Sequence, residues 1–294
     1  MKDRYKNDLI SSSKKPSPAI LEKLIRKALK EDIGRGDITS EAIIPPDLKF
    51  TGKIIAKEDG LIAGLEVAGR CFQLLNPEIE FLTQVEDGAS VQRGEIIALL
   101  KGSARDILMA ERVALNFLQR MSGIATVTRK FVDAIQGTSA VLLDTRKTVP
   151  GLRLLDKWAV SLGGGQNHRF GLYDMILIKE NHIRVAGSLD EAVSRVRNRW
   201  GNKKFIEIEV TNLTELQEAI RLQVNRIMLD NMDLDDIQQA VQITAGRIPL
   251  EVSGNVTLEN ISAIARCGVQ FISNGMLTHS VKAMDISLLL TGTN

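Results

Sequence analysis

Residues 205–210 read Phe-Ile-Glu-Ile-Glu-Val (FIEIEV), a short run in which two glutamates stand among apolar residues. Side chains along a strand alternate between its two faces, so Glu207 and Glu209 share one face. Polar residues at the end of a strand are explained by the solvated loop that follows, but two carboxylates within a strand are not. The stretch therefore predicts a buried strand that carries acidic groups toward a functional site.

Five further apolar runs recur from residue 141 onward, separated by segments of helical length. The runs are VLLDT (141–145), MILIK (175–179), RIMLD (226–230), PLEVS (249–253) and VQFIS (269–273). The segments between them carry apolar residues three and four positions apart, and Asn212, Asp233 and Thr257 are suitable residues to begin helices. Repeated strand and helix units predict a parallel sheet with helices outside it.

The ends of these strands favour a barrel over an open sheet. Polar or charged residues close nearly every run, namely Thr145, Arg146, Lys147, Lys179, Glu180, Asn181, Asp230, Asn231, Glu251, Ser253, Ser273 and Asn274. In a barrel the strand ends converge on one mouth, whereas an open sheet concentrates its ligand groups at a single switch point. Loop solvation explains single positions but not the whole set, so we expect an α/β barrel.

The first part of the chain predicts a separate α+β domain. It begins with a helical segment at 19–34, continues with strand-like pieces near 52–64, 79–88 and 94–102, and ends with a long helix from about Ala104. The expected division is a disordered tail at 1–18, an amino-terminal domain at 19–125 that residues 278–294 rejoin, and a barrel at 126–277.

Composition excludes several classes of partner. The 294 residues carry 38 Lys and Arg against 36 Asp and Glu, and a net charge of +2 gives no argument for nucleic acid or an anionic membrane. No apolar run approaches the ~20 residues of a membrane helix. Cys71 and Cys267 match no metal or redox spacing and predict two buried, reduced thiols. We expect a cytoplasmic protein.

Cationic groups gather at the strand ends of the barrel half. They are Arg146, Lys147, His168, Arg169 and Lys179, with His182 close behind. Any one of them could be a solvated surface residue, but together around one mouth they would repel each other in the absence of an anion. The group therefore predicts a substrate with several negative charges.

Glu209 and Asp230 supply the opposite charge at the ends of two different strands. Carboxylates beside a bound phosphate can hold Mg²⁺, a hard ion that takes carboxylate, water and substrate oxygens together. The alternative is that both carboxylates are ion-pair partners of the nearby lysines.

Glycine-rich loops after the last two strands are candidates for binding phosphate. They are Ser253-Gly254-Asn255 and Asn274-Gly275-Met276, and each precedes a helical segment. A third glycine run, at 163–165 in GGGQNHRFG (163–171), follows a helix and precedes a strand, where a phosphate would meet no helix N-terminus. We expect that run to turn the chain and present His168 and Arg169.

Several long motifs together resemble the quinolinate phosphoribosyltransferase family. They are EDIGRGDITSEAI (31–43), ERVALNFLQRMSGIAT (111–126), DTRKT (144–148), KWAVSLGGGQNHRFGLYDMILIKENH (157–182), IEIEV (206–210), IMLDNM (227–232), EVSGN (251–255) and ISNGMLTHS (272–280). The resemblance implies a mixed amino-terminal domain joined to an incomplete α/β barrel. It further implies transfer of phosphoribosyl from phosphoribosyl pyrophosphate to quinolinate with decarboxylation, in NAD biosynthesis, with Mg²⁺.

The resemblance also implies roles for individual residues. Arg146, His168 and Arg169 would bind the quinolinate carboxylates, with Arg112 reaching in from the partner of a homodimer, or of a larger oligomer built from it. Lys147 and Lys179 would lie near carboxylates and phosphates, beside Thr145, and would act in catalysis with Glu209 and Asp230, which would face the ribose and the metal, partly through water. The list for the 5′-phosphate is Ser253, Gly254, Asn255, Asn274, Gly275 and Met276.

Three other functions remain open at this point. The first is an aldolase-type barrel with Lys179 as a Schiff-base nucleophile. The second is a related phosphoribosyltransferase that acts on nicotinate. The third is a non-catalytic, anion-binding or transport-associated homologue that keeps the scaffold.

Overall fold

The computed structural model describes residues 15–292, which form two compact units. The amino-terminal unit comprises residues 15–129, 149–164 and 280–292, and the barrel unit comprises residues 130–148 and 165–279. Most of the tail expected at 1–18 lies outside the described residues, and the chain is helical from Pro18.

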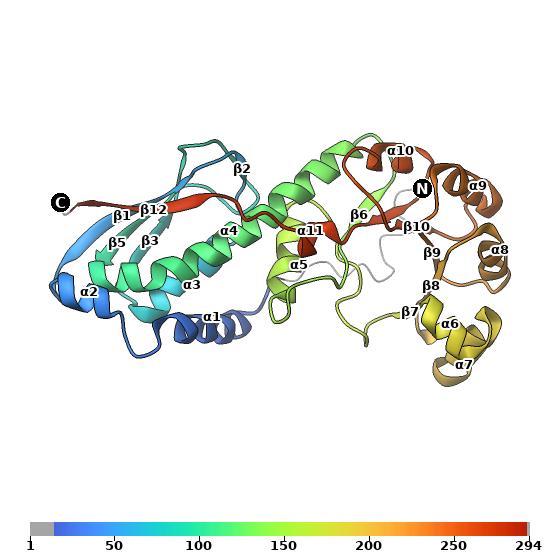
Figure 1. Ribbon diagram of the computed structural model, residues 1–294, viewed down its shortest axis with the longest axis horizontal. Coiled ribbons are helices and arrows are strands. Elements are labelled where there is room, and N and C mark those ends of the chain that lie inside the picture. Colours follow the sequence, from blue (N-terminus) through green and yellow to red (C-terminus); the bar gives the residue numbers. More distant parts are fainter. Residues whose placement is uncertain (1–14, 293–294) are drawn as a thin grey trace. The chain divides into compact units, whose positions relative to one another are not determined.

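A six-stranded parallel sheet forms the centre of the barrel unit (Figure 1). Its strands are β6 (Val141–Leu143), β7 (Ile176–Ile178), β8 (Ile206–Val210), β9 (Arg226–Asp230), β10 (Leu250–Ser253) and β11 (Phe271–Ser273), in the order β6-β11-β10-β9-β8-β7. All six runs predicted as strands are confirmed. Since β6 and β7 end the sheet without pairing to each other, the barrel is incomplete.

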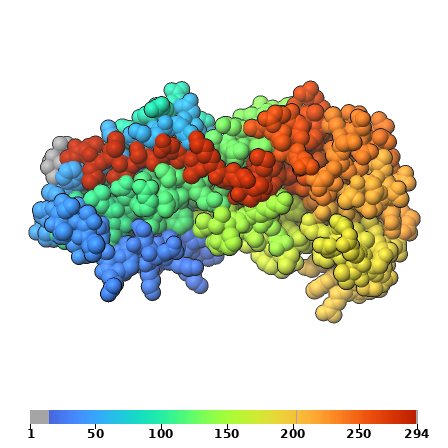
Figure 2. Space-filling view, viewed as in Figure 1, coloured from blue at the N-terminus to red at the C-terminus, as the bar shows by residue number. Residues whose placement is uncertain are grey.

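Helices follow the strands on the outside of this sheet, and α7, α8 and α9 form its outer side in the space-filling view (Figure 2). They are α6 (Glu180–Ala186), α7 (Leu189–Trp200), α8 (Leu213–Arg221), α9 (Leu234–Thr244), α10 (Ile261–Arg266) and α11 (Met276–His279), with a 3₁₀ turn, η1 (Gly201–Lys203). Asn212 and Asp233 cap α8 and α9 as predicted. Thr257 does not cap α10, which starts four residues later, after a turn held by the Asn260 side chain.

Strand register sets which residues meet inside the barrel unit. Glu207 of β8 is paired with Arg226 of β9, and Asp230 of β9 is paired with Ser253 of β10. Because side chains alternate, Arg226, Met228 and Asp230 share the inward face, so these pairs belong to two inward-facing layers with the layer of Met228 between them. The layer at the carboxyl ends of the strands is open to a cavity, and the layer beneath it is buried.

The amino-terminal unit contains a four-stranded antiparallel sheet, ordered β12-β1-β5-β3 (Figure 1). Its elements are α1 (Pro18–Ile33), α2 (Ile38–Ile43), β1 (Lys49–Ala56), β2 (Gly60–Leu61), α3 (Leu65–Leu75), β3 (Glu80–Thr83), β4 (Ser90–Val91), β5 (Ile96–Ser103), most of α4 (Ala104–Ala134), α5 (Arg153–Leu162) and β12 (Ile286–Gly292). The antiparallel sheet and the long helix were predicted. Helix α3, whose Phe72 stacks on Phe81 of β3, was not.

Helix α5 groups with this unit, so the range 126–277 expected for the barrel does not coincide with the barrel unit. The reason is close packing against α4 at Gly163. A Cβ atom there would lie 2.6 Å from both the carbonyl oxygen of Ala125 and the Cβ of Thr128. Gly164 follows with φ +93°, a left-handed conformation that favours glycine. The glycine run therefore serves a tight turn and a helix contact.

Two further predictions concern membrane helices and the two cysteines. Among the described residues, no helix is long and apolar enough to cross a membrane. Cys71 is a buried free thiol, as expected, and burial raises its pKa to about 12. Cys267 is also a free thiol but is partly exposed, because it lies at the end of the short helix α10.

Candidate active site

A cavity of about 800 Å³ opens at the carboxyl ends of the parallel strands. Its lining includes Thr145, Arg146, Lys147, His168, Arg169, Lys179, Glu209, Asp230, Ser253, Gly254, Asn255, Asn274, Gly275 and Met276. These are all the site residues predicted for the barrel half. The structure therefore brings together side chains from six strand ends and from the loop before β7, while their chemical roles stay predictions.

Two guanidinium groups face one side of this cavity. Arg169 is only 7% exposed, and its Nη1 donates to the carbonyl oxygen of Met175 at 3.2 Å. Burial lowers the pKa of Arg169, and the positive charge of Arg146 lowers it further. Two cations held close in a partly dehydrated wall are a site for an anion with two charged groups.

Asp144 holds the loop that carries these cations. Its carboxylate accepts hydrogen bonds from the Asn167 side chain at 2.6 Å and from the His168 main-chain N–H at 2.9 Å. Asp144 is fully buried at the end of β6, directly before Thr145 and Arg146. One carboxylate thus fixes both arms of the cationic wall. The sequence motif DTRKT contains Asp144, but nothing local indicates its partners.

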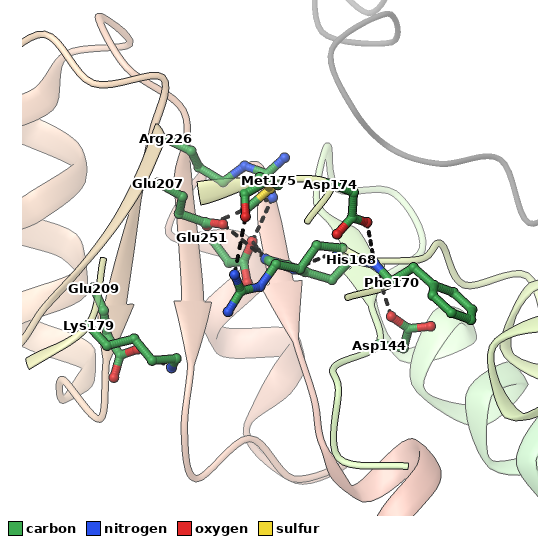
Figure 3. A network of polar contacts seen from close by, with 11 residues as sticks. Asp144, His168, Phe170, Asp174, Met175, Lys179, Glu207, Glu209, Arg226 and Glu251 are labelled. Carbon is green, nitrogen blue, oxygen red and sulfur yellow. Dashed lines mark hydrogen bonds and ion pairs between the residues drawn. The ribbon is translucent and has the colours of Figure 1, made fainter. Parts of the chain in front are cut away.

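Lys179 and Glu209 form an ion pair at the mouth, in accordance with the ion-pair alternative for that carboxylate (Figure 3). Asp230 is close enough to Glu209 to be affected by its charge, because burial and then Glu209 raise the pKa of Asp230. His182 lies outside the cavity lining. Its Nδ1 accepts from the Lys179 main-chain N–H at 3.0 Å, so this histidine helps to begin α6.

Backbone geometry explains the glycine at position 254. Gly254 has φ +86°, and a Cβ there would lie 2.1 Å from Oδ1 of Asn231. Asn231 in turn donates to Asp230 at 2.8 Å and accepts from the Asn255 side chain at 3.1 Å. The loops after β9 and β10 are therefore coupled through one amide group, which sequence reasoning did not assign to the site.

Glycine is also required at position 275, because two other side chains lie close to it. A Cβ there would lie 2.8 Å from Cδ of Lys147 and 3.0 Å from Cδ2 of His279. The hydroxyl of Thr278 donates to the carbonyl oxygen of Lys147 at 2.8 Å, which ties α11 to the loop after β6. Lys147 and His279 thus border the second glycine-rich loop.

Several lining residues were missed by the sequence analysis. They are Leu177, Met228, Asn231, Val256, Thr257, Ser273 and His279. Leu177 and Met228 lie two residues before Lys179 and Asp230, so the two-residue period of a strand could have identified them. His279 stands in the motif ISNGMLTHS without an assigned role. Its contact with Gly275 depends on the fold of α11.

A buried charged cluster lies beneath the cavity and comprises Glu207, Arg226, Glu251 and His168 (Figure 3). Burial and the charge of Glu207 raise the pKa of Glu251 to about 7. For Glu207, burial acts in the opposite direction, but His168 and Arg226 outweigh it and lower the pKa. For His168, burial disfavours the charged ring, while Glu251 and Glu207 raise its pKa above the ordinary value.

We expect Glu251→Gln to change how stability depends on pH. A carboxyl group with a pKa of about 7 when folded and 4.5 when unfolded binds its proton more tightly in the folded state. Its contribution to stability is therefore complete below pH 4.5 and is lost as the pH rises to about 7. By linkage this loss amounts to at most about 3 kcal/mol. Urea unfolding from pH 5 to 8 should show a shallower decline in the variant.

The exposed Glu31→Gln provides a matched control, because Glu31 lies on the surface of α1. Its stability curve should run parallel to the wild-type curve. If the Glu251→Gln curve is also parallel to it between pH 5 and 7, the raised pKa of Glu251 is wrong.

Arg112 is the one predicted site residue outside this cavity. It is an exposed residue of α4 and belongs to the amino-terminal unit. Its expected role depends on a second copy of the chain.

Together, the incomplete parallel barrel and the mouth described above define an α/β-barrel enzyme. Guanidinium groups, a lysine–glutamate pair and two glycine-rich loops suit substrates that carry carboxylates and phosphates. Family models place the chain more narrowly. The model described as quinolinate phosphoribosyl transferase, C-terminal domain, matches residues 124–289, and that of the N-terminal domain matches residues 37–122. The chain belongs to the quinolinate phosphoribosyltransferase family.

Individual relatives are similar over nearly the whole chain. A tobacco (Nicotiana tabacum) protein named quinolinate phosphoribosyltransferase [decarboxylating] 2b, mitochondrial, is 44% identical over 287 residues, which cover 91% of this chain and 81% of that protein. A Bacillus subtilis protein named probable nicotinate-nucleotide pyrophosphorylase [carboxylating] is 43% identical, with 93% and 94% covered.

Solved structures agree with the fold. NadC from Streptococcus pyogenes has a TM-score of 0.91 at 40% identity and covers 95% of this chain and 99% of its own. The nicotinate-nucleotide pyrophosphorylase from Francisella tularensis has a TM-score of 0.90 at 44% identity, with the same coverage. The incomplete barrel and the mixed amino-terminal unit are therefore features that this chain shares with the family.

Proposed function

We propose that this protein transfers the phosphoribosyl group of phosphoribosyl pyrophosphate to quinolinate and releases pyrophosphate, CO₂ and nicotinate mononucleotide, a step of NAD biosynthesis. One observation carries the proposal furthest. Arg146 and Arg169 face the same cavity as the two glycine-rich loops, so a planar dicarboxylate and a sugar phosphate can be held side by side.

The cationic wall suits the acid substrate. Quinolinate has two carboxylates on adjacent ring carbons, and arginines bind planar carboxylates in a fixed orientation. We assign Arg146 and Arg169 to these carboxylates, with His168 beside them in the cavity lining, where both of its ring nitrogens bond within the protein. Lys147 lies between this wall and the second glycine-rich loop, where it can reach a carboxylate or a phosphate.

The loops after β10 and β11 suit the 5′-phosphate. Gly254 and Gly275 line the cavity in loops that pack closely against Asn231 and Lys147, and the adjoining Ser253, Asn255 and Asn274 add polar groups. Met276 lines the same loop at the start of α11, and its main-chain N–H donates to the Asn274 side chain at 2.8 Å. Glu209 and Asp230 line the same cavity, and we assign them to the ribose.

Chemistry follows from this arrangement. The ring nitrogen forms a bond to C1 of the ribose as the C1–O bond to pyrophosphate breaks, and Glu209 and Asp230 stabilise the positive charge that develops on the sugar. The resulting pyridinium accepts the electron pair left when the bond from the ring to the adjacent carboxylate breaks. CO₂ leaves, and Lys147 or a water supplies the proton that takes its place.

Mg²⁺ is part of the proposal, with Glu209 and Asp230 as the residues that would hold it, partly through water. Their fit rests on two carboxylates near enough for the charge of one to raise the pKa of the other, a condition that a divalent cation relieves. The ion would supply positive charge to the departing pyrophosphate.

Lys179 is not suited to act as a Schiff-base nucleophile in this structure. Its ammonium group is held in an ion pair with Glu209, so it is not free to attack a carbonyl carbon. The aldolase-type alternative is thereby disfavoured.

Product analysis tests the proposed function. Purified protein is incubated with Mg²⁺, phosphoribosyl pyrophosphate and either quinolinate or nicotinate, while CO₂ and mononucleotide are followed. We expect both products from quinolinate and no mononucleotide from nicotinate. Product from nicotinate alone would indicate the nicotinate-specific alternative, and no product from either acid would favour the non-catalytic one. Borohydride should trap no covalent adduct.

A homodimer with shared sites is also part of the proposal, and it predicts complementation. Arg112→Ala removes the residue contributed to the partner, and Lys179→Ala removes one kept in the subunit's own site. Each variant alone should be inactive. Because random pairing makes half of all dimers mixed and each mixed dimer holds one intact site, co-refolded variants should regain about a quarter of wild-type activity. A mixture that stays inactive would contradict site sharing.

Localisation is proposed as cytoplasmic. The support is the pair of free thiols, which suits a reducing compartment. Some plant relatives carry mitochondrial or chloroplastic in their names. Fractionation of cells that express the full chain would decide between these compartments.

A further inference from the structure

The buried charged cluster is unusual for the interior of a barrel. Glu207 and Glu251 are fully buried and Arg226 is 4% exposed, and none of these three lines the cavity. Barrel interiors are ordinarily filled by branched apolar side chains. Burying charged groups costs free energy, whereas apolar side chains would fill the same space without that cost. This cluster therefore calls for a role beyond stability.

Its contacts converge on His168 (Figure 3). The ring Nε2 lies 3.0 Å from Oε2 of Glu207 and 3.6 Å from Oε2 of Glu251. Arg226 Nη1 lies 2.8 Å from the same Glu251 oxygen and 3.9 Å from Oε1 of Glu207. His168 is also the one member of the cluster that lines the cavity, so it connects the buried layer to the site.

The other ring nitrogen of His168 is engaged by its own chain. Nδ1 accepts a hydrogen bond from the main-chain N–H of Arg169 at 2.8 Å. A nitrogen that accepts carries no proton, so these hydrogen bonds assign the neutral ring with its proton on Nε2, donated to Glu207. The ring therefore links the buried layer to the backbone of the residue whose guanidinium faces the cavity.

Charge balance gives Glu251 a specific place in this link. The cluster holds two carboxylates and one guanidinium, so one further proton, on Glu251 or on His168, balances its charge. Protonated Glu251 with a neutral ring is balanced, and ionised Glu251 with a charged ring is balanced as well. In the second case the hydrogen bond from Arg169 N–H to Nδ1 is lost, because both groups would then be donors.

We propose that Glu251 is a positioning residue for the acid substrate: with Arg226 and Glu207 it holds the ring of His168, and through that ring the main chain of Arg169. This proposal rests on the proposed function for the identity of the acid. Glu251 itself touches no substrate, since it does not line the cavity.

The test is Glu251→Leu, which fills a similar volume and removes the carboxyl group that bonds to Arg226. We expect the KM for quinolinate to rise roughly tenfold, as for other residues that orient a ligand-binding side chain, while kcat and the KM for phosphoribosyl pyrophosphate stay within about twofold. Imidazole ¹⁵N spectra provide a second readout. The chain has three histidines, so the His168 signal can be assigned by substitution, and it alone should shift in the variant.

Thr244→Val is the matched control, since Thr244 is a buried polar residue of α9 in the same unit. It should leave both KM values and the His168 signal unchanged. The proposal is overturned if Glu251→Leu leaves the His168 signal and the KM for quinolinate unchanged, or raises the KM of both substrates equally.

Wild-type spectra decide the question if the variant does not fold. A slowly exchanging proton on Nε2 and an unprotonated Nδ1 are expected without substrate, and a rapidly exchanging His168 ring would overturn the proposal. If the protein converts no quinolinate, the proposed function fails, and the dependence of the His168 signal on Glu251 still tests the buried link.

Discussion

Arg169→Ala should lower kcat/KM for quinolinate by on the order of 10³-fold, because removing one partner of a dehydrated ion pair costs about 4 kcal/mol. Arg169 is 7% exposed and lines the cavity, where its Nη1 donates to the Met175 carbonyl oxygen. Steady-state kinetics with phosphoribosyl pyrophosphate saturating would measure the loss. The KM for phosphoribosyl pyrophosphate, measured separately, should change little.

Stability should move in the opposite direction. Burial and the charge of Arg146 both oppose the charged form of Arg169, so removing this guanidinium relieves repulsion in the wall. The variant should therefore melt at or above the wild-type temperature. Arg184→Ala is the control, because Arg184 pairs with Glu180 on the exposed face of α6. Activity in Arg169→Ala as high as in Arg184→Ala would remove Arg169 from the site.

Local sequence patterns were sufficient for the barrel and for most of its mouth. Apolar runs predicted all six strands, and polar residues at their ends identified the cavity lining from Thr145 to Met276. Both signals can be read from each strand's own sequence. The carboxyl end of every parallel strand lies at the common mouth, whichever strands it pairs with. The helix caps Asn212 and Asp233 could also be predicted from local sequence, because a capping side chain bonds to an N–H three residues away.

Contacts between distant segments were beyond such patterns. Gly163 is needed because a Cβ atom there would clash with Ala125 and Thr128 of α4. Both residues lie more than thirty positions earlier in the chain. Asp144, Asn231 and Glu251 act through partners on other strands or loops, and no spacing in the sequence encodes them. Thr257 failed as a cap for a local reason. The Asn260 side chain accepts the Thr257 main-chain N–H, and α10 begins only after this turn, at Ile261.

Gly254→Ala is the second change with a large expected effect. The new Cβ would lie 2.1 Å from Oδ1 of Asn231, so Asn231 must move, and it would take with it the hydrogen bonds to Asp230 and Asn255. We expect the KM for phosphoribosyl pyrophosphate to rise about 10²-fold and kcat to fall as well, because the phosphate loop and the Asp230 carboxylate are disturbed together. Strain at φ +86° should also cost about 2 kcal/mol of stability.

Gly246→Ala separates backbone strain from this clash. Gly246 also has a left-handed φ, +71°, but a Cβ there meets no atom within 4 Å, so the variant should lose about 1 kcal/mol of stability and keep both KM values. The double variant Asn231→Gly with Gly254→Ala removes the clash while tolerating the positive φ of 55° at position 231. It should regain stability without regaining the KM, since Asp230 still lacks its amide partner. Kinetics of Gly254→Ala that match those of Gly246→Ala would show that the Asn231 link does not shape the site.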